Sequence, residues 1–193
     1  HVNIESDIIA VDGQIVNTKQ HYYVKFHKPK GYVTAVEDAS HPVVMDLLPP
    51  EYIKMGVVPV GRLDKDTEGL LLLTNDGVWG HSIINGNKHV EKVYYVEFEG
   101  ELTEDGIQRI KEGIVLGDGT HCQPALIDVL SPKSVHITIE EGKYHQVKRM
   151  IGAAGGTVTY LKRLTIGHID LTGIEEIGSV QDLSSDDIEA FKK

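Results

Sequence analysis

Residues 60–77 read Val60-Gly-Arg-Leu-Asp-Lys-Asp-Thr-Glu-Gly-Leu-Leu-Leu-Leu-Thr-Asn-Asp-Gly77. The leucines at 70–73 form a short apolar run that turn-forming residues stop at 75–77, which favours a buried strand over a helix. Asp64 comes shortly before that strand, so its carboxylate is expected at the edge of the core. Burial and a neighbouring cation can set the reactivity of such a carboxylate as a nucleophile, a general base or a metal ligand.

The same loop also has a simpler interpretation. Its charged side chains at alternating positions are Arg62, Asp64, Asp66 and Glu68. Acid-rich loops of this kind commonly form solvated, salt-bridged surface segments. Spacing alone favours this second interpretation, so the rest of the chain has to decide between the two.

Strand patterns lie on both sides of this segment. A hairpin is expected over residues 7–16, because two β-prone runs flank the turn signal Asp12-Gly13. Further strands are expected at 22–26, 92–100, 124–130, 134–140, 157–161 and 166–171.

Helical patterns are fewer. Residues 38–60 are proline-rich and mostly irregular, with one helical turn expected at 43–48. Longer helices are expected at 104–114, with Thr103 as the N-cap, at 144–154, and after Ser184 or Ser185. Because strands outnumber helices and do not alternate regularly with them, the sequence predicts an α+β fold. Its core would be a mixed, largely antiparallel sheet with flanking helices.

Composition excludes several classes of protein. The chain has 193 residues, of which 40% are hydrophobic and 25% charged, as in soluble globular proteins. No apolar run approaches the roughly 18 residues of a membrane helix, so no membrane partner is expected. A single cysteine, Cys122, rules out an internal disulfide and fits a cytoplasmic protein.

No cofactor or metal is expected either. The ten histidines are scattered without a His-x-x-x-His pair, which argues against zinc or iron. Neither a Walker A loop nor a G-x-G-x-x-G sequence is present.

Local charge contradicts the overall charge. Lysine and arginine number 19 against 29 acids, a net charge of −10, which by itself argues against nucleic acid. Yet residues 140–163 hold five Lys or Arg against two Glu, and residues 25–30 hold three lysines without an acid. Two basic islands, with acids gathered at 97–105 and 170–189, predict a basic face for a phosphate backbone and an acidic back.

Each of these signals has a structural alternative. On a helix, His145, Lys148 and Arg149 share one face, which is also what an ordinary amphipathic helix with a basic exposed side would show. Tyr94 can stack on a flat base, a contact worth roughly 1–3 kcal/mol, but strand tyrosines more often pack in the core.

Four segments together resemble the motifs of the RsuA-type ribosomal RNA pseudouridine synthases, in the same order. The first two are Lys28-Pro-Lys-Gly-Tyr-Val33 and Gly61-Arg-Leu-Asp64, continued to Gly77. The others are Glu91-Lys-Val-Tyr94 and Glu141-Gly-Lys-Tyr-His-Gln-Val-Lys-Arg-Met150. The resemblance runs from about residue 21 to the C-terminus. Residues 160–167 are more similar to the branch that acts on small-subunit RNA.

The resemblance implies the pseudouridine synthase catalytic fold and an isomerase that needs no cofactor and no metal. Asp64 matches the catalytic aspartate, proposed to attack either the ribose C1′ or the uracil C6. Tyr94 matches the tyrosine that stacks on the target uracil, and Lys148 matches the basic residue that pairs with the aspartate. The target base would be flipped out of its helix, with Arg62 helping to displace it.

The implied partner is ribosomal RNA, from the small subunit or an assembly intermediate of it, and the protein is expected to be a monomer. The residues expected to bind this RNA are Arg62, Lys28, Lys30, His145, Gln146, Arg149, Lys162 and Arg163. Residues 1–20 resemble the trailing piece and linker of an N-terminal S4-type RNA-binding domain, and residues 21–193 form the catalytic domain.

Two other functions stay open at this point. A non-catalytic RNA-binding or ribosome-assembly factor with the same fold would use the basic face but not Asp64. A glycoside hydrolase would need a second acid some 5–10 Å from Asp64. Asp66 or Asp76 can be nominated for that second acid, although nothing in the sequence makes either an acid catalyst.

Overall fold

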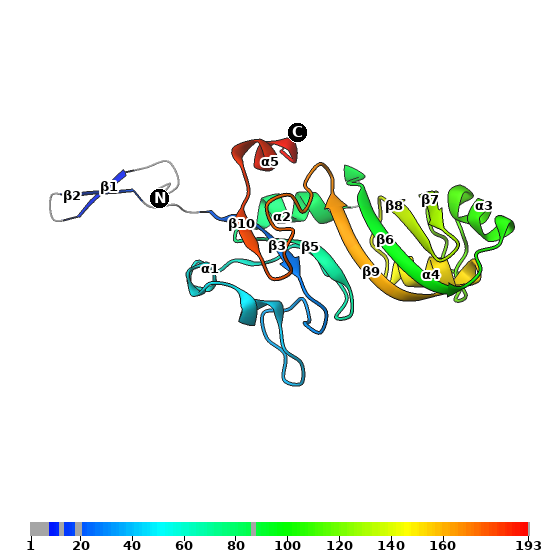
Figure 1. The fold of residues 1–193 in the computed structure, drawn as a ribbon. Coiled ribbons are helices and arrows are strands. Elements are labelled where there is room, and N and C mark those ends of the chain that lie inside the picture. Colours follow the sequence, from blue (N-terminus) through cyan, green and yellow to red (C-terminus); the bar gives the residue numbers. More distant parts are fainter. Residues whose placement is uncertain (1–7, 12–13, 18–20, 86–87, 193) are drawn as a thin grey trace.

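The computed structural model describes residues 8–11, 14–17, 21–85 and 88–192 (Figure 1). The expected N-terminal hairpin is present as β1 (Ile8–Val11) paired antiparallel with β2 (Gln14–Asn17). Its predicted turn, Asp12-Gly13, lies outside the described residues.

One sheet dominates the described residues. Its eight strands run in the order β10-β3-β5-β9-β6-β8-β7, with β4 paired to β5 beside this path. They are β3 (Tyr23–Lys28), β4 (Val58–Pro59), β5 (Glu68–Thr74), β6 (Lys92–Gly100), β7 (Leu126–Ser131), β8 (Ser134–Ile139), β9 (Gly156–Ile166) and β10 (Val180–Asp182). Within this sheet only the β5–β9 pair is parallel, so the prediction of a mixed, largely antiparallel sheet is confirmed.

The parallel contact joins two halves of the sheet. β5 meets β9 only at Glu68 opposite Lys162 and Gly69 opposite Arg163, and in Figure 1 β6 and β9 run on from there as a long pair. Gly69 has a φ of +115°, and a Cβ atom on it would overlap the backbone carbonyl of Arg163. Only glycine allows β5 and β9 to approach this closely.

Helices flank the sheet. They are a short 3₁₀ helix, η1 (Val44–Leu47), followed by α1 (Pro50–Lys54), α2 (Gly77–Ile84), α3 (Glu104–Glu112), α4 (Gln146–Ala153) and α5 (Ser185–Ala190). The caps predicted for α3 and α5 are confirmed, because the Thr103 and Ser184 hydroxyls accept hydrogen bonds from the backbone N–H groups of Gly106 and Asp187. η1 and α4 also form where helical turns were expected.

The sequence prediction was wrong in several places. The second strand expected at 166–171 is absent, because β9 ends at Ile166 and the chain turns at Gly167, whose φ is +60°. α1 begins with Pro50 in a stretch expected to be irregular, since proline suits the first position of a helix. The short edge strand β10 was not predicted. α2 was missed because Asp76, interpreted only as a turn residue, also caps that helix by accepting from the Trp79 N–H.

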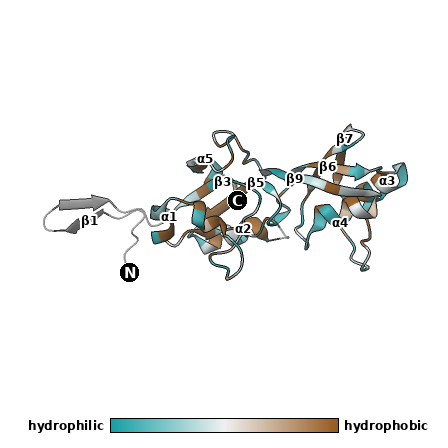
Figure 2. Ribbon diagram, turned by 60° about the horizontal axis from the view of Figure 1, so that its bottom comes forward, coloured by the Kyte–Doolittle hydropathy of each residue, from teal (hydrophilic) through white to brown (hydrophobic). Residues whose placement is uncertain are grey.

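Two apolar clusters fill opposite faces of β5. Leu71 and Leu73 belong to one cluster and Leu70 and Leu72 to the other, and all four are fully buried. This is the alternation that a strand covered on both faces requires. Figure 2 shows hydrophobic and hydrophilic residues interleaved along the helices and strands, as expected for elements with one or more buried faces. Among the described helices none has the length and apolar character needed to cross a membrane.

Candidate active site

Asp64 lies in the loop between β4 and β5, and this loop is held from within the protein by Lys28 of β3. Lys28 is fully buried. Its ammonium group donates to the backbone carbonyls of Pro29 at 3.1 Å, Asp64 at 3.0 Å, Lys65 at 3.2 Å and Thr67 at 2.8 Å. Burial lowers the pKa of Lys28 to about 8, against the opposing attraction of Asp66 and Asp64.

This placement corrects the expectation that Lys28 contacts a phosphate. Every residue of β3 is buried, so a lysine on this strand has no route to solvent and satisfies the loop carbonyls instead. The same loop is fixed further by Thr34, whose hydroxyl accepts from the Leu63 N–H at 3.2 Å. The Gly31 N–H also donates to the Lys65 carbonyl at 2.8 Å.

The Asp64 carboxylate faces two side chains from the start of α4. Lys148 Nζ lies 3.6 Å from Oδ2, and His145 Nε2 lies 3.4 Å from Oδ1. The Asp64 side chain keeps 29% of its surface exposed, so the carboxylate is reachable from outside. The predicted pairing of Asp64 with Lys148 is confirmed, although the two residues are far apart in the sequence.

Lys148 also serves a second carboxylate. Its ammonium donates to Asp66 Oδ1 at 2.6 Å, which is shorter than its contact with Asp64. Burial acts to raise the pKa of Asp66, but the hydrogen bond and charge of Lys148 outweigh it and hold that pKa below its ordinary value. A glycoside hydrolase needs an acid with a raised pKa beside its partner carboxylate, so Asp66 is unsuited to that role.

Asp76, the other acid considered for such chemistry, is held at the start of α2. Its carboxylate accepts from the Tyr23 hydroxyl at 2.5 Å and from the Trp79 N–H at 3.1 Å. Burial acts to raise the pKa of Asp76, but these hydrogen bonds leave it below the ordinary value. Neither candidate acid therefore supports the hydrolase alternative.

Tyr94 lies on β6, directly across from Arg163 on β9. The Arg163 guanidinium donates to the Tyr94 hydroxyl at 3.4 Å and to the Leu70 carbonyl at 2.9 Å. Arg163 therefore ties Tyr94 to β5, the strand that follows the Asp64 loop. Arg163 is only 5% exposed, so its predicted phosphate contact is not available in this structure. Tyr94 is 8% exposed and packs in the larger apolar cluster, as the structural alternative expected, and its stacking on a uracil stays a prediction.

Lys92 is a candidate functional residue that the sequence analysis did not single out. It precedes Tyr94 by two residues on β6, so the two side chains leave the strand on the same face. Burial, together with the nearby charge of Arg163, lowers the pKa of Lys92 to about 8. The available signal was its place in the Glu91-Lys-Val-Tyr94 motif combined with the period of a strand.

The remaining predicted RNA-binding residues are divided between surface and interior. Arg62 and Lys30 are exposed, and Lys30 Nζ lies 4.9 Å above the ring of Tyr160. Lys162 is half-buried, and Arg149 pairs with Asp118 at 2.6 Å.

Gln146 was predicted to bind RNA, but its side chain is buried. Its amide donates to Glu141 at 2.8 Å and accepts from the Lys143 N–H at 2.9 Å. Gln146 therefore fixes the loop before α4 and does not reach the surface where RNA would bind.

The cations of the two basic islands lie in different surroundings. Lys25, from the first island, is buried on β3 and donates to the carbonyls of Asp170 and Thr172. On α4, by contrast, Lys148 contacts Asp64 and Arg149 pairs with Asp118. The acid-rich α3 packs at the C-terminal end of α4, where the Thr103 N–H donates to the Ala154 carbonyl at 3.3 Å. In the second island Lys148 lies at Asp64 and Arg163 is buried, and the basic face itself stays a prediction.

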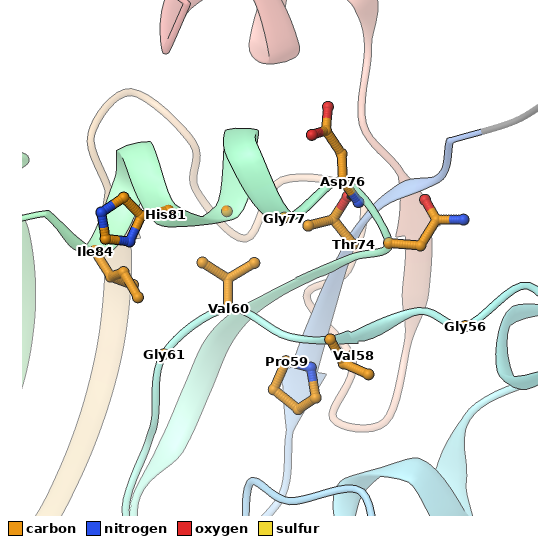
Figure 3. A pocket seen from close by; sticks show the side chains of 12 residues that line it. Gly56, Val58, Pro59, Val60, Gly61, Thr74, Asp76, Gly77, His81 and Ile84 are labelled. Carbon is orange, nitrogen blue, oxygen red and sulfur yellow. The ribbon is translucent and has the colours of Figure 1, made fainter. Parts of the chain in front are cut away.

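A hollow of about 290 Å³ lies elsewhere, between β4 and α2 (Figure 3). Val60 and Ile84 border it from its two sides, and Asp64, His145 and Lys148 do not line it. In the part of the chain that the structure describes, no three His, Cys, Asp or Glu side chains group in a way that could hold a metal ion. The hollow is therefore separate from the contacts around Asp64.

Comparisons with known proteins identify the family of this chain. The family model described as RNA pseudouridylate synthase matches residues 22–153. A Bacillus subtilis (strain 168) protein named RNA pseudouridine synthase YtzG is 37% identical over 192 residues, covering 97% of this chain and 80% of the relative. The ribosomal small subunit pseudouridine synthase A of Escherichia coli (strain K12) is 38% identical over 183 residues, covering 93% and 78%.

A solved structure shows the same fold. The crystal structure of a pseudouridylate synthase superposes with a TM-score of 0.81 at 36% identity, covering 89% of this chain and 74% of that one. The predicted fold class is confirmed by this likeness. On its motifs, its fold and these relatives, the chain belongs to the RNA pseudouridylate synthase family and, within it, to the RsuA-type enzymes.

Proposed function

We propose that this enzyme converts a specific uridine of small-subunit ribosomal RNA to pseudouridine, with Asp64 as the nucleophile. The observation that carries the proposal is the Asp64 carboxylate, partly exposed and placed between Lys148 and His145 on a loop anchored from inside by Lys28. The name of the Escherichia coli relative supports the small subunit as the source of the RNA.

The reaction rearranges atoms within one nucleotide. Asp64 attacks either C1′ of the ribose or C6 of the uracil, and the bond between N1 and C1′ breaks. The uracil turns, a new bond forms between C5 and C1′, and the bond from Asp64 to C1′ or C6 breaks and frees the carboxylate. C5 loses its proton and N1 gains one. Because the product is an isomer of the substrate, no oxidant, reductant or second substrate is required.

The side chains around Asp64 have distinct tasks in this scheme. The Lys148 ammonium, 3.6 Å from the carboxylate, balances its negative charge before attack. Tyr94, held by Arg163, offers a ring for stacking on the uracil and a hydroxyl near the site of proton loss. Arg62 is exposed two residues before Asp64, where it can occupy the space that a flipped nucleotide leaves.

Other parts of the proposal follow from the charge distribution. The cations of α4 and its neighbours bind the phosphate backbone, so RNA affinity falls as salt rises. Residues 1–20 supply the end and linker of an S4-type RNA-binding domain, and residues 21–193 carry the catalysis. The protein acts as a cytoplasmic monomer without a metal or cofactor.

Tritium release from small-subunit ribosomal RNA labelled at C5 of uridine tests the proposal. The wild-type chain should release tritium with multiple turnover, and Asp64→Asn should release none above background. Asp66→Asn, a neighbouring carboxylate with the same change in charge, serves as the matched control and should keep most of the activity. Normal release by Asp64→Asn would overturn the assignment, and the absence of release by the wild type together with tight RNA binding would favour a non-catalytic binding factor.

A further inference from the structure

An exposed tyrosine lies next to the catalytic carboxylate. Tyr144 is 75% exposed, and its ring stacks on the imidazole of His145 with ring centres 3.9 Å apart and planes 19° apart. His145 in turn places Nε2 3.4 Å from Asp64. Asp64, His145 and Tyr144 therefore form a chain of contacts that leads from the reactive group to solvent.

The loop that carries Tyr144 is fixed by several hydrogen bonds. Arg149 donates to the Tyr144 carbonyl at 3.0 Å, and Gln146 binds both the Lys143 N–H and Glu141. Glu141 also accepts from the Gln123 N–H at 2.7 Å. These contacts hold the loop from both ends, so the tyrosine ring is presented in a defined place.

The backbone at His145 carries strain. Its φ of 47° and ψ of 39° are left-handed, a conformation that a non-glycine residue rarely adopts. This conformation turns the imidazole toward Asp64 and under the Tyr144 ring. The start of an ordinary helix requires neither a left-handed residue nor a pair of stacked rings. The strained backbone at His145 therefore supports a functional role for the arrangement of the two rings.

The surroundings of the outer ring face suit one class of ligand. Lys143 is next to Tyr144 in the sequence, and Lys148 and Arg149 follow on α4. Each of these cations also pairs with an acid, namely Glu141, Asp66 and Asp118 in the same order. An exposed aromatic ring in a segment that carries lysine and arginine suits a nucleotide, whose base stacks on the ring while its phosphate exchanges with the acids for these cations. When a target uridine is flipped out, the bases on either side of it lose a stacking partner.

We propose that Tyr144, backed by His145, stacks on a base of the substrate RNA next to the target uridine. The proposal rests on the proposed function, because it takes the flipped uridine to be at Asp64. Tyr144 is a positioning residue in this account, since it binds a neighbouring nucleotide and does not touch the reacting atoms.

Fluorescence tests the stacking separately from catalysis. Tyr144→Trp places an emitting ring at the proposed platform, and the native Trp79 is a constant background because it is buried. A transcript of small-subunit ribosomal RNA should quench the new emission in the range of RNA concentrations where the protein binds. Val78→Trp, at an 85% exposed position on α2, is the matched control and should not be quenched. Equal quenching at both positions, or none at 144 while RNA binds, would overturn the proposal.

Kinetics give the second readout. Tyr144→Ala should raise KM for the RNA by about 5- to 150-fold, equivalent to about 1–3 kcal/mol of lost stacking, and leave kcat within about twofold. Tyr144→Phe should restore the wild-type KM, because a ring without the hydroxyl still stacks. An unchanged KM in Tyr144→Ala would overturn the proposal. Absence of tritium release by the wild type would instead count against the proposed function, while the quenching still reports on the platform.

Discussion

The loop that carries Asp64 has an inner side and an outer side, and a lysine contacts it from each. On the inner side, Lys28 is fully buried and donates to four backbone carbonyls. On the outer side, Lys148 is a quarter exposed and contacts the carboxylates of Asp64 and Asp66. The inner lysine therefore shapes the backbone, and the outer lysine acts on the reactive charge.

The difference comes from the number of buried faces on the element that carries each lysine. β3 lies between β10 and β5 with both faces covered, so its cations must find carbonyl partners inside the protein. α4 has one apolar stripe, with Val147, Met150 and Ile151 buried, and its other face remains open for charge. Similar local charge in the two segments thus leads to a structural role in one and a surface role in the other.

Removing the inner lysine should have the largest effect. Lys28→Met leaves loop carbonyls buried without their donor, and it should lower the free energy of unfolding by about 4 kcal/mol. For a domain of this size that corresponds to a fall in Tm of roughly 8–16 °C, measurable by thermal or urea unfolding. Tritium release should fall as well, even at temperatures where the variant is folded.

Lys25 provides the matched control for that variant. It is also buried on β3 and also donates to backbone carbonyls, but these belong to Asp170 and Thr172, away from the Asp64 loop. Lys25→Met should destabilise the fold by about 2 kcal/mol and keep its activity when folded. Equal loss of activity in both variants would remove the special link between Lys28 and the loop.

Removing the outer lysine should affect activity with little effect on stability. Lys148→Met takes the cation from beside Asp64, and kcat should fall about 100-fold, which corresponds to about 2.7 kcal/mol in the barrier. The free energy of unfolding should change by less than about 1 kcal/mol, because the ion pair is partly exposed. Lys111→Met, on the exposed side of α3, should change neither quantity. A strongly destabilised Lys148→Met would contradict the division between inner and outer roles.

A smaller effect is expected from Arg62, an exposed cation on the outer side. If Arg62 contacts the RNA backbone, Arg62→Ala should reduce the slope of log K against log salt by about 1. Filter binding of small-subunit ribosomal RNA between low and moderate salt measures this slope. Lys25→Met should leave the slope unchanged, because a buried lysine releases no counterion on binding. A slope that Arg62→Ala does not alter would remove Arg62 from the interface.

The smallest effect concerns Asp66. Its pKa is lowered in the folded protein, so its pairing with Lys148 adds stability above the ordinary carboxyl pKa near 3.9, and this stability is lost as pH falls through the lower folded value. Because the Asp66 side chain is 69% exposed, Asp66→Asn should cost less than about 1 kcal/mol at pH 7. Urea unfolding of both proteins should show this difference at pH 7 and a progressively smaller one as pH falls below the ordinary carboxyl pKa. A difference that persists in acid would contradict the pairing.

Much of the fold could be predicted because its signals are local. The leucine run of β5, the alternation of β6 and the caps Thr103 and Ser184 each depend on neighbouring residues only. β10 and the parallel junction at Gly69 depend on partners far away in the chain, and no local pattern reports them. Asp76 was misjudged because the same residue type serves turns and helix caps.

The predictions for the candidate site also separate into those with local signals and those that depend on distant segments. The motifs brought Asp64 and Lys148 together correctly, since both lie beside exposed loops that a motif can mark. Lys28, Gln146 and Arg163 were expected at the RNA surface but are buried. A charged side chain inside a protein depends on carbonyls and acids supplied by other segments, so its burial follows from tertiary packing and not from its own sequence.

The central claim is that Asp64 on this loop makes pseudouridine in small-subunit ribosomal RNA. Pseudouridine mapping of ribosomal RNA from a strain that lacks the protein, complemented with wild type or with Asp64→Asn, tests it most directly. The account predicts that one small-subunit site loses its pseudouridine in the deletion strain, regains it with the wild type and stays unmodified with Asp64→Asn. An unchanged map in the deletion strain, or restoration by Asp64→Asn, would contradict it.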